Sequence, residues 1–153
     1  MSPDSEQDTE PLGGKIGIGN ILTEYLYDTG ACKTVINEGL YYRLLLTYDL
    51  DIRPCTNKIS TCNGTMYVLG KITVPKCTLA SDVVIENVDI LVAKDLKQYE
   101  CIMGRDLLAK IPCLQKSRKL IRQKVQNMTA SLEACWQSRC EEEDNIIYSG
   151  FAD

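Results

Sequence analysis

One aspartate in this chain is well placed to do chemistry, because it follows an apolar segment and precedes a glycine. Asp28 comes directly after the apolar and aromatic residues 25–27 and opens the tripeptide Asp28-Thr29-Gly30. The chain contains no histidine, which excludes Ser-His-Asp and Cys-His catalysis within it. Carboxylates would therefore have to carry any acid–base chemistry. The same tripeptide is also compatible with an ordinary turn, since all three residue types are favoured there.

The bulk composition is that of one globular domain with tails. The chain has 153 residues, of which 44% are hydrophobic and 25% charged, and its net charge is -4. A net negative charge does not favour long-range attraction to nucleic acid or to an anionic membrane surface. No apolar run approaches the length that spans a bilayer. We therefore expect neither nucleic acid nor a membrane as a partner.

Cysteine usage favours free thiols over a metal site. The eight cysteines contain no C-x-x-C pair, and the absence of histidine removes the other usual zinc ligand. Residues 1–12 are mostly polar and acidic and do not resemble a signal sequence. We therefore expect an intracellular, cytoplasmic location with reduced cysteines, no metal and no cofactor.

Short β-strands separated by tight turns are predicted up to residue 112. A hairpin is expected at Asn63-Gly64, which suits a type I′ turn, and its second arm is expected to run as far as Pro75. Residues 39–50 fit either a helix or a strand. A short helix over 105–111 should stop at Pro112. The predicted strands are 15–18, 21–27, 34–36, 58–62, 65–69, 71–74, 83–85, 88–92 and 99–103, which makes the fold class all-β.

The C-terminal part of the chain changes character. Apolar residues recur at helical spacing across roughly 117–139, which predicts an amphipathic helix. That helix could be a linker, could bind a partner, or could lie on its own domain. The predicted organisation is a disordered acidic tail over 1–11, a β-domain over 12–112, and a helical extension over 113–153.

The features of residues 12–112, in their order, resemble the retropepsin family, the aspartic proteases of retroviruses and LTR retrotransposons. Asp28 begins the pattern D-T-G-A-x-x-T-V-I, a glycine-tipped hairpin follows it, and a second apolar-apolar-glycine run ends at Gly104. The hairpin composition and the form I-M-G-R-D-L-L over 102–108 look closer to retroelements of the gypsy class than to lentiviral enzymes, whose hairpins are rich in glycine. The resemblance implies a closed barrel that is one half of an aspartic protease, with one short helix after Gly104.

The resemblance also implies an activity and an assembly. Two carboxylates in contact share one proton, so that one acts as base and the other as acid. This chain has a single Asp-Thr-Gly, so the second aspartate must come from another copy in a symmetric homodimer. Catalysis would then rest on Asp28, Thr29 and Gly30, with Thr29 joining the two active-site loops across the dimer axis. The protein would be an aspartic endopeptidase that processes a Gag-Pol-like polyprotein.

Residues for substrate binding and for bracing the site follow from the same resemblance. The hairpin would close over an extended peptide, which would pair with the backbone of the loop and the hairpin. The strand before Gly104 would thread the loop that bears Asp28. The expected substrate-binding residues are Gly30, Ala31, Cys32, Thr61, Cys62, Asn63, Gly64, Thr65, Lys94 and Asp95. The expected brace is Ile102, Met103, Gly104 and Arg105.

Two departures from the family pattern bear on these expectations. Cys32 stands where viral relatives often have an aspartate that pairs with the arginine matching Arg105, so we expect Arg105 to need another partner. The hairpin carries Met66 and Tyr67 and has few glycines, so it should be stiffer than the hairpins of viral relatives. The alternative to an enzyme is a retropepsin-like module kept for dimerisation or peptide capture, with little or no cleavage. The intact D-T-G-A favours the enzyme.

Overall fold

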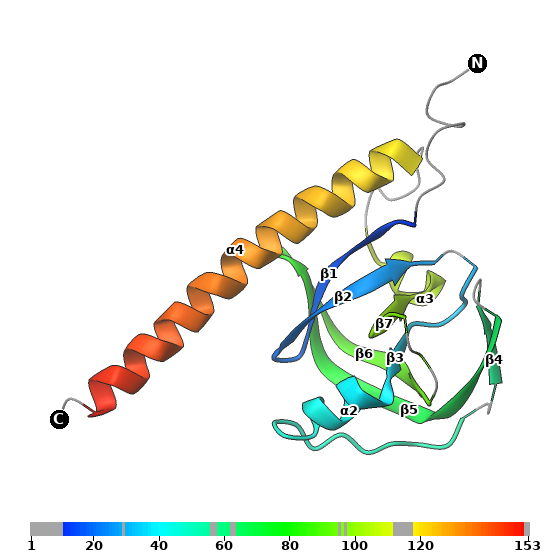
Figure 1. The fold of residues 1–153 in the computed structure, drawn as a ribbon, viewed down its shortest axis with the longest axis horizontal. Coiled ribbons are helices and arrows are strands. Elements are labelled where there is room, and N and C mark those ends of the chain that lie inside the picture. The colour runs from blue at the N-terminus through cyan, green and yellow to red at the C-terminus, as the bar shows by residue number, and fades with distance from the viewer. Residues whose placement is uncertain are drawn as a thin grey trace.

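The fold is a single sheet that closes on itself, with one long helix lying across it (Figure 1). The structure is a computed structural model that describes residues 11–28, 30–55, 58–61, 64–94, 96, 98–111 and 118–151, with backbone alone for 59–61, 64, 118 and 139–151. The strands are β1 (Gly13–Ile18), β2 (Ile21–Tyr27), β3 (Val35–Asn37), β4 (Lys58–Thr61), β5 (Gly64–Ala80), β6 (Val83–Ala93) and β7 (Cys101–Met103). The helices are α2 (Glu38–Leu44), α3 (Arg105–Leu108) and α4 (Arg118–Phe151).

The order of the strands in the sheet is β1-β2-β7-β3-β6-β5-β4, and β1 also pairs with β5. This extra pairing joins Gly17 to Thr78 and Ile18 to Cys77, and it closes the first six strands of that order into a barrel. Strand β4 pairs with β5 alone and extends the sheet beyond the barrel as a hairpin. The predicted all-β fold class is confirmed.

Strand β5 is longer than the sequence suggested. The prediction that its arm ends at Pro75 is wrong, because β5 continues without interruption to Ala80. Pairing with β6 passes over Pro75 and Asn87 and resumes on the next residues. Proline has no N–H to donate, and Asn87 opposite has a positive φ of 53°, so one pair is missing while the register on either side is kept.

The ambiguous segment 39–50 begins as a helix, α2, followed by a turn. The side chain of Asn37 caps α2, since its Oδ1 accepts a hydrogen bond from Leu40 N at 2.8 Å. Leu40 and Leu44 are buried on one side of α2, which is the helical stripe rather than the strand pattern. The predicted helix over 105–111 is shorter than expected, because α3 ends at Leu108 and a turn follows.

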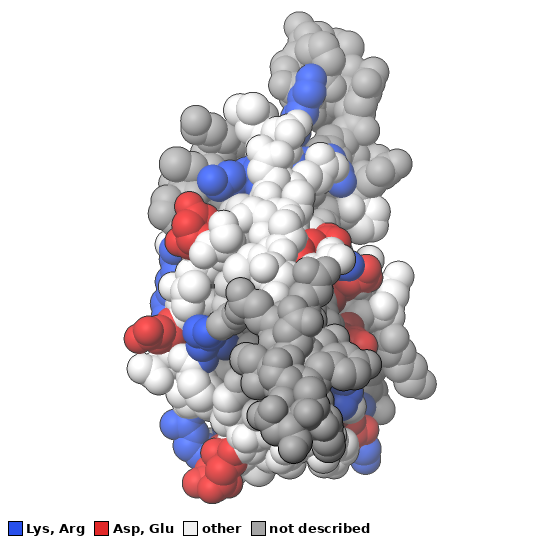
Figure 2. All heavy atoms as spheres, turned by 90° about the vertical axis from the view of Figure 1, so that its left-hand side faces the viewer, with Lys and Arg blue, Asp and Glu red and all other residues white. Residues whose placement is uncertain are grey.

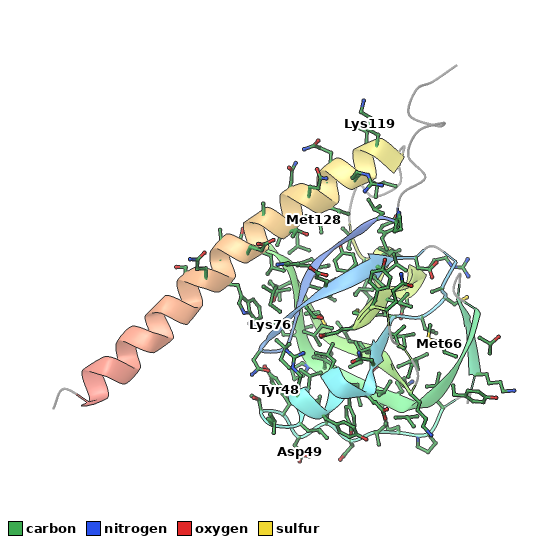
Figure 3. The ribbon with its side chains drawn as sticks, in the orientation of Figure 1. Tyr48, Asp49, Met66, Lys76, Lys119 and Met128 are labelled. Carbon is green, nitrogen blue, oxygen red and sulfur yellow. The ribbon has the colours of Figure 1, made fainter. Side chains whose placement is uncertain are left out.

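Helix α4 lies on its own domain against β1 and β5. Val125, Met128 and Leu132 are buried on the side that faces the sheet, and Figure 3 shows Met128 there with Lys119 pointing away. Lys15 N donates a hydrogen bond to Thr129 Oγ1 at 3.0 Å, which satisfies a backbone group of β1. The helix is longer than the predicted 117–139, and its C-terminal part extends past the barrel (Figure 1).

Leu132→Ala should lower the free energy of unfolding by about 2–5 kcal/mol, since it empties a fully buried site between α4 and the sheet. The matched control is Leu120→Ala on the same helix, where the side chain is 52% exposed, and it should change stability by no more than about 0.5 kcal/mol. Urea denaturation of the three proteins measures both. Equal stability of the two variants would show that α4 is not docked as described.

Buried thiols should resist alkylation in the folded protein. Burial raises the pKa of Cys77 to about 12 and also raises the pKa of Cys101, so both stay neutral at pH 8. Alkylation requires the thiolate, which a thiol with a raised pKa forms less readily. Cys32, in contrast, is exposed and accessible to the reagent. Iodoacetamide at pH 8, followed by peptide mass spectrometry, should modify Cys32 first and reach the two buried thiols only after unfolding. Modification of all three at one rate would contradict the packing around β5 and β7.

Candidate active site

The loop that carries Asp28 joins β2 to β3 and crosses the end of β7, the strand that lies between them. Strand β7 pairs in parallel with β2, with Tyr27 opposite Met103, and antiparallel with β3 on its other side. The loop of residues 28–34 joins β2 to β3, so it must pass over the C-terminal end of β7. This topology places the residues after β7 directly against the loop.

Asp28 is buried at the point where β2 ends, with 4% of its surface exposed. Its backbone N donates to Met103 O at 3.1 Å, which extends the pairing of β2 with β7 by one residue. Its carboxylate oxygen Oδ1 accepts a hydrogen bond from Gly30 N at 2.8 Å. The tight turn is closed by Ala31 N, which donates to Asp28 O at 3.2 Å. The carboxylate is therefore held by the backbone of its own loop.

The segment after β7 braces the rest of the loop. Arg105 N donates to Ala31 O at 2.9 Å, and Asp106 N donates to Cys32 O at 3.2 Å. Gly104 is buried, and a Cβ at this position would lie 2.5 Å from the backbone of Lys33. Three of the four residues expected to form the brace, Met103, Gly104 and Arg105, thus lie against the loop. Ile102 pairs with Leu26 and Val35 and packs in the core beneath.

Thr34 and Asp106 hold the brace together, and the sequence assigned them no role. The Thr34 hydroxyl accepts from Gly104 N at 3.1 Å and donates to Asp106 Oδ1 at 2.8 Å. Asp106 Oδ1 also accepts from Leu107 N at 2.8 Å. Thr34 is 1% exposed although it is polar, so its position depends on these hydrogen bonds. Both residues are part of the two patterns that carry the resemblance, D-T-G-A-x-x-T-V-I and I-M-G-R-D-L-L, and that was the signal in the sequence.

The expectation that Arg105 would need a partner other than residue 32 is wrong. Its Nη2 donates to Cys32 Sγ at 2.7 Å, so residue 32 is a partner of Arg105 even though it is a cysteine. Both side chains are exposed. Cysteine sulfur is a weaker hydrogen-bond acceptor than a carboxylate oxygen.

The hairpin of β4 and β5 lies on the same side of the barrel as the Asp28 loop. Its inward residues Met66 and Val68 belong to a buried apolar cluster that also contains Leu26, Ala31 and Ile102. Thr65 and Tyr67 alternate with them and are exposed. The inner face of the hairpin is therefore continuous with the residues that flank and underlie Asp28.

The remaining candidate substrate-binding residues are only partly placed. Lys94 is exposed and its N donates to Tyr67 O at 3.1 Å, which ties the segment after β6 to the hairpin. Thr61 pairs with Gly64 at the end of the hairpin. Gly30 and Cys32 are exposed beside Asp28. The other candidates, Thr29, Cys62, Asn63 and Asp95, lie outside the residues that the structure describes.

A cavity of about 490 Å³ lies beside the first residues of β2, not at Asp28. Its lining includes Thr23, Arg43 and Glu100, and the Glu100 carboxylate accepts from Thr23 Oγ1 at 2.8 Å and from Arg43 Nη1 at 3.1 Å. These polar groups are already paired with one another. The volume of this cavity gives no reason to move the candidate site away from the braced carboxylate.

The described part of the chain contains neither a metal-binding cluster nor a membrane-spanning helix. Among the described residues, no three histidine, cysteine, aspartate or glutamate side chains are grouped so that they could hold a metal ion. In the same part of the chain, no helix has the length and apolar character to cross a bilayer. Figure 2 shows basic and acidic side chains interspersed over the face that it draws.

The chain has the retropepsin-like fold, as comparison with solved structures shows. A retropepsin-like aspartic protease from Rickettsia conorii matches with a TM-score of 0.52 and 20% identity, over 69% of this chain and 82% of that one. EIAV protease complexed with the inhibitor HBY-793 matches with a TM-score of 0.53 and 24% identity, over 67% of this chain and 89% of that one. No protein-family model and no curated protein matches the sequence. At these identities the likeness concerns the fold, and activity has to be argued from the site.

Proposed function

We propose that this protein is an aspartic endopeptidase in which Asp28 activates the attacking water. One observation carries the proposal: a nearly buried carboxylate, oriented by Gly30 N–H, stands at the end of a strand and is braced from below by the segment after β7. Burial of a carboxylate is costly, so an aspartate held in this way is a candidate for a chemical role. The retropepsin-like fold supports the same assignment.

The second carboxylate of the proposed site belongs to another copy of the chain. Hydrolysis of an amide without a metal needs both a base and an acid, and the sequence contains a single Asp-Thr-Gly. A two-fold axis beside the loop of residues 28–34 would bring the two Asp28 carboxylates together. Helix α4 extends away from the β4 side of the barrel in Figure 1, so α4 does not cover the hairpin side where the partner would bind.

The proposed chemistry conserves protons between the two aspartates. The ionised Asp28 of one copy takes a proton from the water, whose oxygen attacks the carbonyl carbon of the peptide. The protonated Asp28 of the other copy donates its proton to the carbonyl oxygen, which gives a neutral tetrahedral diol. The diol then collapses as the C–N bond breaks: the aspartate that took the proton from water gives it to the leaving nitrogen, and the other, now ionised, takes a proton from a diol hydroxyl. Two like charges in contact cannot both ionise cheaply, and this keeps one proton shared between them.

The substrate of this site would be an extended peptide. Gly30 has no side chain to obstruct an approaching backbone, and Cys32 in the same loop is also exposed. The hairpin of β4 and β5 would cover the peptide from the other side, so that the peptide adds a strand between the two. The pattern I-M-G-R-D-L-L over 102–108 favours a retroelement of the gypsy class, in which the natural substrate would be a Gag-Pol-like polyprotein.

The proposal is tested by incubating a mixed peptide library with the folded protein at mildly acidic and at neutral pH. Each arm is run with and without a statine-type inhibitor, and sedimentation at the same concentration records the oligomeric state. We expect cleavage that the inhibitor removes, from a protein that sediments as a dimer. A folded dimer that binds peptides without cleaving them would instead identify a peptide-binding module.

A further inference from the structure

Strand β5 changes direction where it leaves the barrel and enters the hairpin. Its pairing with β6 shifts between Val68, which pairs with Ala93, and Gly70, which pairs with Val92. Such an irregularity bends a strand and increases its local twist. The direction in which the hairpin leaves the barrel therefore depends on what fixes β5 at and just beyond Gly70.

The segment that precedes the hairpin is pressed against β5 at this bend. Arg53 N donates to Lys71 O at 2.8 Å, and Lys71 N donates back to Arg53 O at 2.9 Å. A Cβ on Gly70 would lie 2.5 Å from Ile52 Cγ1 and 2.7 Å from Arg53 O. The chain before β4 and the root of β5 are thus in direct contact through their backbones.

The side chain of Arg53 continues this contact across two strands. Its Nη2 lies 2.6 Å from Thr73 Oγ1 on β5 and 3.3 Å from Asp89 Oδ1 on β6. Thr73 Oγ1 donates to the same oxygen of Asp89 at 2.6 Å, and Lys71 Nζ lies 4.0 Å from the other carboxylate oxygen. This clamp, formed by Arg53, Thr73 and Asp89, connects the segment before the hairpin to both strands behind it.

The exposure of the clamp argues against a role in global stability. The side chains of Arg53 and Asp89 are 49% and 55% exposed, and exposed ion pairs contribute little to the free energy of unfolding. Their geometry is nonetheless specific, because one guanidinium reaches two acceptors on two strands. A contact of this kind constrains the direction of the hairpin more than it raises the free energy of unfolding.

We propose that Arg53 is a positioning residue that sets the angle of the hairpin over Asp28. This inference rests on the proposed function, because the hairpin matters to catalysis only if peptide binds beneath it. Without the clamp the hairpin samples more orientations, and peptide binding has to restrict them at a cost in affinity. The substrate should then bind less well while the chemical step at Asp28 stays nearly unchanged.

The test compares Arg53→Ala and Asp89→Ala with a matched control, Arg43→Ala. Arg43 is also an exposed arginine paired to a carboxylate, Glu100 at 3.1 Å, but it lies on α2 rather than at the hairpin. We expect the two clamp variants to raise KM by about five- to tenfold with kcat within about twofold, and the control to change neither. Hydrogen exchange of residues 65–69 without substrate should be faster in the clamp variants alone.

Unchanged KM and unchanged exchange in both clamp variants would overturn the inference, as would a lower kcat at constant KM. The exchange measurement needs no catalysis, so it tests the clamp even if the wild type cleaves nothing. Faster exchange of 65–69 in a protein without protease activity would support the positioning of the hairpin by Arg53 and overturn the proposed function alone.

Discussion

Asp28→Asn abolishes peptide cleavage, with kcat at least about a thousandfold lower, if the proposed chemistry is correct. The amide can neither take a proton from water nor share one with a second carboxylate, so both acid and base functions are lost. Folding should be retained, because the asparagine oxygen can still accept the hydrogen bond from Gly30 N. Initial rates on a peptide cleaved by the wild type measure the loss, and circular dichroism verifies the fold.

The control for this prediction is Asp82→Asn, which makes the same chemical change at an exposed aspartate in the turn between β5 and β6. It should cleave at the wild-type rate. If Asp28→Asn retained more than about a tenth of the wild-type activity, another group would have to activate the water. The proposal for Asp28 would then fail while the fold assignment stood.

The second large effect concerns the brace. Gly104→Ala should lower the free energy of unfolding by about 3 kcal/mol and remove most activity, because the new methyl group would overlap the backbone of Lys33. Gly104 has a φ of -93°, so the backbone conformation itself suits any residue and the cost is steric. The overlap displaces the loop of residues 28–34. Thermal or urea denaturation measures the first effect, and peptide cleavage the second.

Gly39→Ala is the matched control for the steric argument. A Cβ at Gly39 would meet only Asn37 Oδ1, at 3.7 Å, and alanine favours a helix such as α2. It should leave stability unchanged or raise it by up to about 1 kcal/mol. Equal effects of the two substitutions would mean that Gly104 is not in contact with the loop.

The sequence predicted the fold class and the elements that carry strong local signals. Residues 21–27 form β2 with the predicted bounds, and the Asn63-Gly64 pair correctly indicated the hairpin of β4 and β5. These elements rest on β-branched and aromatic residues between turn signals and on turn chemistry, which act over a few residues. Asp28 was likewise found from its position after a buried strand.

Other features depend on contacts between distant segments and could not be read locally. The continuation of β5 through Pro75 depends on Asn87 in the facing strand, twelve positions along the chain by their numbering. The contact of Arg105 with Cys32 depends on the crossing of β7 by the loop, which brings together residues 73 apart in sequence. Periodicity predicted a helix near α4, but not whether its apolar side would meet this domain or another. Tertiary packing decides each of these cases.

Mixing wild-type and Asp28→Asn subunits tests the central claim most directly. The total subunit concentration is held constant and well above the dissociation constant of the dimer, and cleavage is recorded as the wild-type fraction falls. If each active site needs two Asp28 carboxylates, activity falls with the square of that fraction, to about one quarter at equal amounts. Activity that falls in proportion, to about one half, would show that each chain acts alone and would contradict the shared site.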